Sequence, residues 1–311
     1  MSMKKFVFTT VSLVALVLIF GHPHRASALT LSPARRIVTI DPGTAQDLKV
    51  TVTNDEAKSV RLQLLVTGLK QDPAGLPLFG NGYDDAEKWV VPAPELLVLE
   101  PGQQGFATFK LQVPAGTFPG SHWVALAVES RPDTTGTAIL NQRLISLLSI
   151  QVSGVVTESL TMNTAVSERI VLGSKPFDAA IKIQNTGSIE VPLTGKITIR
   201  SLRGKEVGGR DVQLGNQLLP QSERSLLEKI STTKKDACDV DGTVCSELVW
   251  PGLYTLTAEV IYGKTGQTVE SETSFWYVPY WSLFLLTVGV GLGVWIVRRI
   301  RQRSMIKKYV A

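Results

Sequence analysis

Apolar side chains recur at every second position through most of the chain, and this alternation constrains the fold more than any other feature. Leu48, Val50 and Val52 alternate with polar residues, and the pattern returns around Ile181 and Ile197. Such a period is typical of β-strands with one buried face. Turn-forming segments separate the runs: Asp41-Pro42-Gly43, Thr53-Asn54-Asp55, Glu100-Pro101-Gly102, Asn185-Thr186-Gly187 and Arg203-Gly204-Lys205. The sequence therefore predicts an all-β protein built from antiparallel sandwiches.

The length of the chain is enough for two such sandwiches. Between its two unusual ends lie about 250 residues, and an Ig-like sandwich uses roughly 100. The strand-like run Leu144–Val152 ends just before Ser153-Gly154, and a new run follows. We therefore expect tandem Ig-like β-sandwiches at residues 29–153 and 154–277, joined by a short junction.

Residues 1–28 have the pattern of a secretory signal peptide. Lys4 and Lys5 precede an uncharged apolar run, and Ala26-Ser27-Ala28 has the small-x-small form that signal peptidase accepts. We expect the mature chain to begin near Leu29. An uncleaved N-terminal anchor is the alternative, which the polar residues at 22–25 disfavour.

The other end predicts a single transmembrane helix at residues 278–297. These 20 residues contain no charge and are long enough to cross about 30 Å of hydrocarbon. Aromatic residues flank the run, and a basic tail at 298–311 follows with no acidic residue. Because basic residues are retained on the cytoplasmic side, we expect a cell-membrane protein with extracytoplasmic domains and a cytoplasmic tail. Gly289 and Gly293 form a small-xxx-small pair, which keeps a homodimer through this helix open.

The positive net charge of the chain comes from its two ends. The formal net charge is +5, with 32 basic and 27 acidic residues. Without the nine basic residues of the two ends, 23 basic residues face 27 acidic ones, a net charge of −4. Nucleic-acid binding requires a clustered positive surface, so we expect no nucleic-acid partner.

The predicted mature chain offers little for catalysis. Its one histidine is His122, which we expect to face solvent or a polar partner on a strand. Segments such as Ser231-Thr232-Thr233-Lys234 and Lys264-Thr265-Gly266 match fragments of enzyme motifs without the rest of the motif. We therefore expect no enzyme activity, no catalytic residue, no cofactor and no metal.

Two features outside the strands are candidates for other roles. Cys238 and Cys245 are the only cysteines, and in an oxidising compartment we expect them to form a disulfide. Acidic residues at 236–241 leave open whether a calcium ion binds this loop.

The segment from Gln71 to Pro94 interrupts the alternation and carries aromatic and acidic residues. Long loops on a rigid sandwich are common recognition surfaces. The candidate partner-binding residues here are Tyr83, Asp84, Asp85 and Trp89. For Trp89 the alternative is that it caps the core at the start of the next strand.

Several short motifs resemble those of WxL-interacting proteins, a family of Gram-positive bacteria. In the first domain they are Ile40-Asp41-Pro42-Gly43, Glu100-Pro101-Gly102 and Phe118-Pro119-Gly120; in the second, Leu219-Pro220-Gln221-Ser222 and Trp250-Pro251-Gly252-Leu253. The resemblance implies a peptidoglycan-binding Ig-like domain, a second Ig-like domain that binds a host, and a membrane anchor. It points to a membrane-anchored binding or scaffold protein at the cell surface that recognises cell-wall glycan or a surface protein.

The first domain also resembles the N-terminal domain of periplasmic pilus chaperones. The resemblance rests on Arg35-Arg36-Ile37-Val38 and on the alternating strand Leu144–Val152. Those chaperones hold a subunit's terminal carboxylate with a basic pair and lend a strand to it. It implies Arg35 or Arg36 as one cation, although the strand offers no lysine. The alternative function is therefore a membrane-tethered assembly factor that acts by strand donation.

Overall fold

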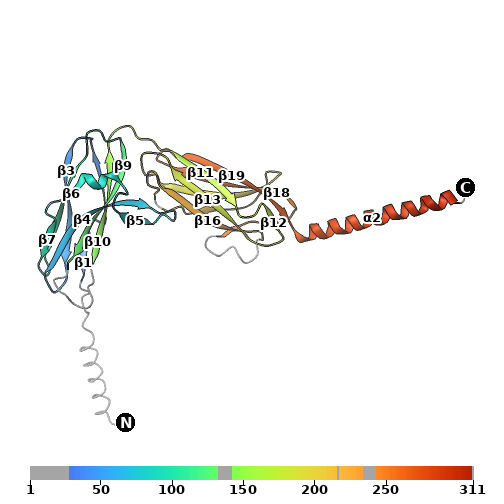
Figure 1. Ribbon diagram of the computed structural model, residues 1–311, viewed down its shortest axis with the longest axis horizontal. Coiled ribbons are helices and arrows are strands. Elements are labelled where there is room, and N and C mark those ends of the chain that lie inside the picture. The colour runs from blue at the N-terminus through green and yellow to red at the C-terminus, as the bar shows by residue number, and fades with distance from the viewer. Residues whose placement is uncertain (1–27, 132–141, 216, 234–242, 310–311) are drawn as a thin grey trace, which may run out of the picture.

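The computed structural model describes residues 28–131, 142–215, 217–233 and 243–309. The predicted signal peptide, apart from Ala28, and the acidic loop with Cys238 lie outside these ranges. The described chain forms two β-sandwiches followed by one long helix (Figure 1). The prediction of an all-β fold of tandem sandwiches is confirmed.

The first sandwich consists of sheets A and B. Sheet A has the strand order β1-β3-β8-β6, and sheet B has the order β2-β10-β9-β4-β5, with β7 also paired to β4. The bounds in sheet A are β1 Leu29–Ser32, β3 Ala45–Asn54, β8 Gln104–Gln112 and β6 Val90–Pro92. Those in sheet B are β2 Arg35–Ile40, β10 Arg143–Val152, β9 Gly120–Ser130, β4 Val60–Gln71, β5 Pro77–Gly80 and β7 Leu96–Leu99.

The second sandwich consists of sheets C and D. Their strand orders are β11-β13-β16-β17 and β12-β19-β18-β14-β15. The bounds in sheet C are β11 Leu160–Val166, β13 Phe177–Asn185, β16 Glu223–Ser231 and β17 Thr243–Cys245. Those in sheet D are β12 Ile170–Leu172, β19 Gln267–Val278, β18 Gly252–Tyr262, β14 Leu193–Ser201 and β15 Glu206–Val212. The predicted junction at Ser153-Gly154 falls between β10 and β11.

The sheets are mixed, whereas the sequence predicted antiparallel ones. In each sandwich the first segment gives one strand to each sheet: β1 and β11 pair antiparallel with β3 and β13, while β2 and β12 run parallel to β10 and β19. β16 and β17 are also parallel. The first segment thus crosses from one sheet to the other and lies beside the last strand of its sandwich.

The two sandwiches repeat the same design, down to one buried residue. β3 ends at Asn54 and β13 ends at Asn185, and both side chains are fully buried. The Asn54 amide donates to the carbonyls of Lys58, Leu99 and Glu100, and the Asn185 amide donates to those of Ile189 and Leu218. Each side-chain oxygen accepts from the backbone N–H two residues on. This equivalence was not predicted from the sequence.

Each sandwich has its own apolar core, built by the alternating residues. Leu48, Val50 and Val52 are buried in the first core, and Ile181, Ile183 and Ile197 in the second. A third, small cluster joins the sandwiches through Leu69, Trp123 and Leu219. Burial of these faces supplies the main favourable free energy of folding.

The segment from Gln71 to Pro94 is more ordered than the loop that was predicted. It contains β5, which pairs with β4, and the 3₁₀ helix η1 at Asp85–Trp89. In Figure 1, β5 extends from the first sandwich toward the second. Pro73, at the tip of the β4–β5 hairpin, accepts a hydrogen bond from the backbone of Ser225 in β16 at 2.7 Å.

The helix α2 spans Tyr280–Tyr309 and leaves the second sandwich at the end away from the first (Figure 1). Its stretch Tyr280–Ile300 is long and apolar enough to cross a membrane, and none of it is buried against the rest of the chain. Length and composition thus agree with the expected span, whose position in a membrane stays a prediction.

Candidate partner-binding surface

Strand β10 is covered along its whole length on one side and only partly on the other. β9 pairs with Arg143–Val152, whereas β2 pairs only with Leu147–Val152. We call Arg143–Ser146 the open edge, because among the described residues it has no ladder partner on the β2 side. The backbone N–H of Leu147 donates to the carbonyl of Ala34 at 2.9 Å. Because backbone groups alternate along a strand, those of Ile145 point to the same side, beyond the end of β2.

The outer face of sheet B, which points away from the first core, is apolar beside the open edge. Leu144 and Leu148 pack in the core, so Ile145 and Leu147 point outward. Ile145 lies opposite Ala127 of β9, and on the other side of Ala127 lies Leu65 of β4. We call Leu65, Ala127, Ile145 and Leu147 the outer apolar row. Ala127 is fully buried and the other three are half-buried. Outward faces of such sandwiches are usually polar, so an apolar row beside an unpaired strand edge favours packing against a partner's side chains.

A charged pair borders this row. Glu129 and Arg143 lie opposite each other on β9 and β10, and their side chains form an ion pair with an N–O distance of 3.3 Å. The pair is partly exposed, so it contributes little to stability. Its position marks the polar limit of the outer apolar row at the start of β10.

The second sandwich closes the other end of the outer face. Leu69, Trp123 and the half-buried Leu147 pack against Leu219. The Gln71 side chain donates to the carbonyl of Gln217 and accepts from the backbone N–H of Leu219, each at 3.0 Å. Apolar packing and paired hydrogen bonds therefore couple the two sandwiches at this corner.

Of the two arginines that the chaperone resemblance implied, the structure brings only one to this corner. The Arg35 guanidinium lies over the Trp123 ring, 4.8 Å from its centroid, and donates to the Gln217 side chain at 2.7 Å. Arg36 instead donates to the backbone carbonyl of Lys49 at 3.1 Å, within the first sandwich. Arg35 therefore belongs to the junction, and Arg36 does not.

Asp84 connects the 71–94 segment to β9. One carboxylate oxygen lies 3.0 Å from His122 Nδ1 and accepts from the backbone N–H of Ala86; the other accepts from that of Trp123 at 3.0 Å. Burial raises the pKa of this carboxyl, but the hydrogen bonds from His122, Ala86 and Trp123 outweigh burial, so the pKa lies below its ordinary value. His122 therefore has the polar partner that the sequence led us to expect.

The other candidates of this segment do not form one site. Trp89 packs against the first core, and its ring contacts the His122 ring in a tilted arrangement, with the centroids 4.6 Å apart and the planes at 60°. Tyr83 is 40% exposed, and Lys70 Nζ lies 4.1 Å from the centroid of its ring. Asp85 is exposed and pairs with Lys88. Trp89 thus caps the core, the alternative that the sequence left open.

The remaining predicted positions lie elsewhere. Cys245 ends β17, and Cys238 lies outside the described residues, so their pairing stays a prediction. Gly289 and Gly293 lie on α2 with open space where a Cβ would be, and their role in a dimer stays a prediction. The described ranges contain no group of three or more His, Cys, Asp or Glu side chains that could hold a metal ion.

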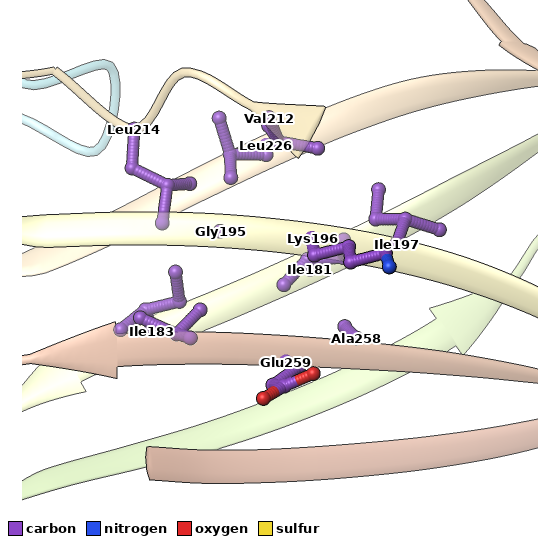
Figure 2. Close-up of a pocket in the computed structure, with 11 residues that line it drawn as sticks. Ile181, Ile183, Gly195, Lys196, Ile197, Val212, Leu214, Leu226, Ala258 and Glu259 are labelled. Carbon is purple, nitrogen blue, oxygen red and sulfur yellow. The ribbon is translucent and has the colours of Figure 1, made fainter. Parts of the chain in front are cut away.

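The hollow in Figure 2 lies inside the second sandwich, between sheets C and D, and is lined mainly by core residues such as Ile183, Ile197 and Leu214. Its volume is about 10 Å³, which leaves room for at most one water. It is a packing space and not a ligand site.

No family model and no curated protein matches the chain, so the resemblance to WxL-interacting proteins finds no support. Solved structures with a similar arrangement include chaperones of fimbriae. The class 5 fimbriae chaperone CfaA is 12% identical over 81% of this chain and 100% of its own, with a TM-score of 0.44. The Salmonella enterica SafB chaperone in complex with the SafA pilin is 13% identical over 82% and 98%, with a TM-score of 0.38. Both structures contain chaperones of the kind that the second resemblance in the sequence named.

Proposed function

We propose that the chain is a non-catalytic assembly factor, tethered to a membrane by α2, that holds an extended segment of another exported protein on the open edge of β10. The half-covered strand β10 is the observation that carries this proposal. Unpaired strand edges are sites where a further strand adds, and natural proteins usually protect them. Here the open edge is short, because pairing with β2 begins at Leu147.

The surroundings of the open edge favour a protein strand as the occupant. Main-chain groups of Ile145 supply hydrogen bonds to any sequence, while the Ile145 side chain offers an apolar contact to the side chains of an added strand. Arg35 is already engaged by Trp123 and Gln217. It therefore holds the junction between the sandwiches, and we do not assign it the capture of a terminal carboxylate.

Recognition of cell-wall glycan, the leading expectation from the sequence, has weaker support in the structure. Stacking on a sugar needs an accessible aromatic face, and Lys70 lies over the Tyr83 ring while Trp89 packs on His122 and the core. Binding to glycan alone is therefore a result of the test that would contradict the proposal.

The test compares Ile145→Pro with Ile145→Val in the full-length chain. Proline removes the N–H that points to the open edge and leaves the pairing with β9 intact, because residue 145 offers its backbone groups to the other side. Losing one main-chain hydrogen bond of about 1 kcal/mol weakens binding by about 5-fold.

Exported proteins that copurify with the tagged wild type are compared with those that copurify with each variant. We expect one or more exported proteins to be depleted from the Ile145→Pro sample and retained by Ile145→Val. Ile145→Lys, which keeps the N–H but places a charge in the outer apolar row, serves as a second variant if the proline variant unfolds. An unchanged set of partners in the folded variants, or retention on peptidoglycan alone, would overturn the proposal.

A further inference from the structure

Large apolar side chains are exposed at the end of the second sandwich from which α2 leaves. Leu202 is 78% exposed, Trp250 is 69% exposed and Trp276 is 55% exposed. Ile170 and Leu172 of β12 are exposed as well. We call these five residues the apolar belt. A water-soluble domain rarely leaves so many large apolar side chains together on one end.

The belt is held together by contacts at the strand ends. The backbone N–H of Leu202 donates to the carbonyl of Leu253 at 3.1 Å, and the Tyr254 hydroxyl donates to the carbonyl of Trp250 at 2.9 Å. Trp276 lies opposite Leu253 on one side and Ile170 on the other. The belt is therefore a fixed surface on the ends of sheet D.

The belt also continues into the first turn of α2. The Trp250 ring meets the ring of Trp281 edge to face, with centroids 5.7 Å apart. Trp281 follows Tyr280, the first residue of α2 and of its apolar stretch. The exposed aromatic surface thus runs without a break from the sandwich to the helix.

The outward face of sheet D changes from apolar to charged in three steps away from α2. The row nearest the helix pairs Leu172 with Val278, and the next outward row holds Ile170, Trp276 and Leu253. The row after it pairs Ser274 with Thr255. Beyond it Glu272 lies opposite Thr257, and then Glu270 lies opposite Glu259. Successive outward rows are about 7 Å apart, which is close to the roughly 5–8 Å thickness of the headgroup layer on each side of a bilayer.

We propose that the apolar belt lies in the headgroup layer of the membrane that α2 crosses, so that the second sandwich stands on the lipid surface. This inference rests on the membrane tether of the proposed function. Amphipathic aromatic rings prefer the headgroup layer, and the polar rows above the belt face water. Arg169 and Arg203, which are exposed next to Ile170 and Leu202, lie where anionic lipid headgroups attract basic side chains.

The test uses tryptophan fluorescence of the full-length chain in phosphatidylcholine vesicles that contain lipids brominated near the headgroup. Trp281 and Trp295 are replaced by phenylalanine, because helix tryptophans are quenched whatever the sandwich does. Trp89, Trp123, Trp250 and Trp276 remain. We expect quenching in this background and its loss after Trp250→Phe and Trp276→Phe, since Trp89 and Trp123 belong to the first sandwich.

Flotation of the vesicles separates the two parts of the claim. Protein that floats with the vesicles but shows no quenching refutes the belt and leaves the tether standing. Protein that does not float refutes the tether, and the belt with it. Quenching that is absent at high protein density and appears only when the protein is diluted with lipid would show that a second copy of the chain covers the belt in preference to lipid, and would also overturn the proposal.

Discussion

Replacing Asn54 with alanine should destabilise the first sandwich far more than the same substitution at an exposed asparagine. The amide donates at 2.9 Å to Lys58 and at 3.1 Å to both Leu99 and Glu100, and the oxygen accepts from Glu56 at 3.0 Å. The variant leaves these backbone groups without their partner. A buried unsatisfied group costs about 1–3 kcal/mol, and the partly buried groups recover some bonds to water, so we expect a total loss of about 2–4 kcal/mol.

Urea unfolding of the full-length chain in detergent, followed by tryptophan fluorescence, measures this loss. Trp89 and Trp123 report on the first sandwich. Asn163→Ala, at an exposed position on β11, is the matched control, for which we expect less than about 0.5 kcal/mol. A loss for Asn54→Ala no larger than that of the control would refute the reasoning that the buried amide closes the end of the strand.

Three further predictions concern other buried groups. Because the pKa of Asp84 is lowered, the ionised carboxylate stabilises the fold above the ordinary pKa of 3.8, and this stabilisation is lost as the pH falls through the lowered pKa. The acid-induced fall in melting temperature should therefore be smaller in Asp84→Asn than in wild type, and an unchanged fall would contradict this. Glu228 is 6% exposed and burial raises its pKa, against a weaker lowering by Arg210. The contribution of Glu228 to stability is therefore greatest below the ordinary pKa of 4.5 and is lost as the pH rises through the raised pKa. Glu228→Gln should melt at a higher temperature than wild type at pH 7 but not at pH 4, and an equal difference in melting temperature at both pH values would count against this. Leu219→Ser should widen the distance distribution between spin labels on the two sandwiches, whereas the exposed Leu227→Ser should not; identical distributions would show that the apolar cluster does not couple them.

Alternation was sufficient to predict the strands but not which sheet each strand joins. Leu48, Val50 and Val52 point to the core as the period requires, since burial of one face is a local property of the sequence. The parallel pairing of β2 with β10 is not local. It depends on where the first segment crosses between the sheets, and residues 32–35 carry no signal for that crossing.

The chaperone resemblance named the strand Leu144–Val152, but the outer apolar row was not predicted, although the sequence contains a signal for it. From Leu144 to Ile150 every residue except Ser146 and Ser149 is apolar, and Trp123–Val128 is a continuous apolar run. Such runs indicate strands covered on both faces. We predicted partner-binding residues in the segment around Tyr83, because long loops often bind partners. Contacts such as Asp84 with His122 join residues 38 positions apart, and neither residue's local sequence specifies the other.

Photo-crosslinking from position 145 in intact cells shows whether an extended segment of another protein lies along the open edge of β10. A photoreactive phenylalanine analogue replaces Ile145 in the full-length chain, and the same analogue at the exposed Asn163 serves as the control. We expect a covalent adduct with another exported protein from position 145 only, with the attachment mapped to an extended, alternating apolar segment of that protein. Adducts that are absent at position 145, or that are the same at both positions, would contradict it.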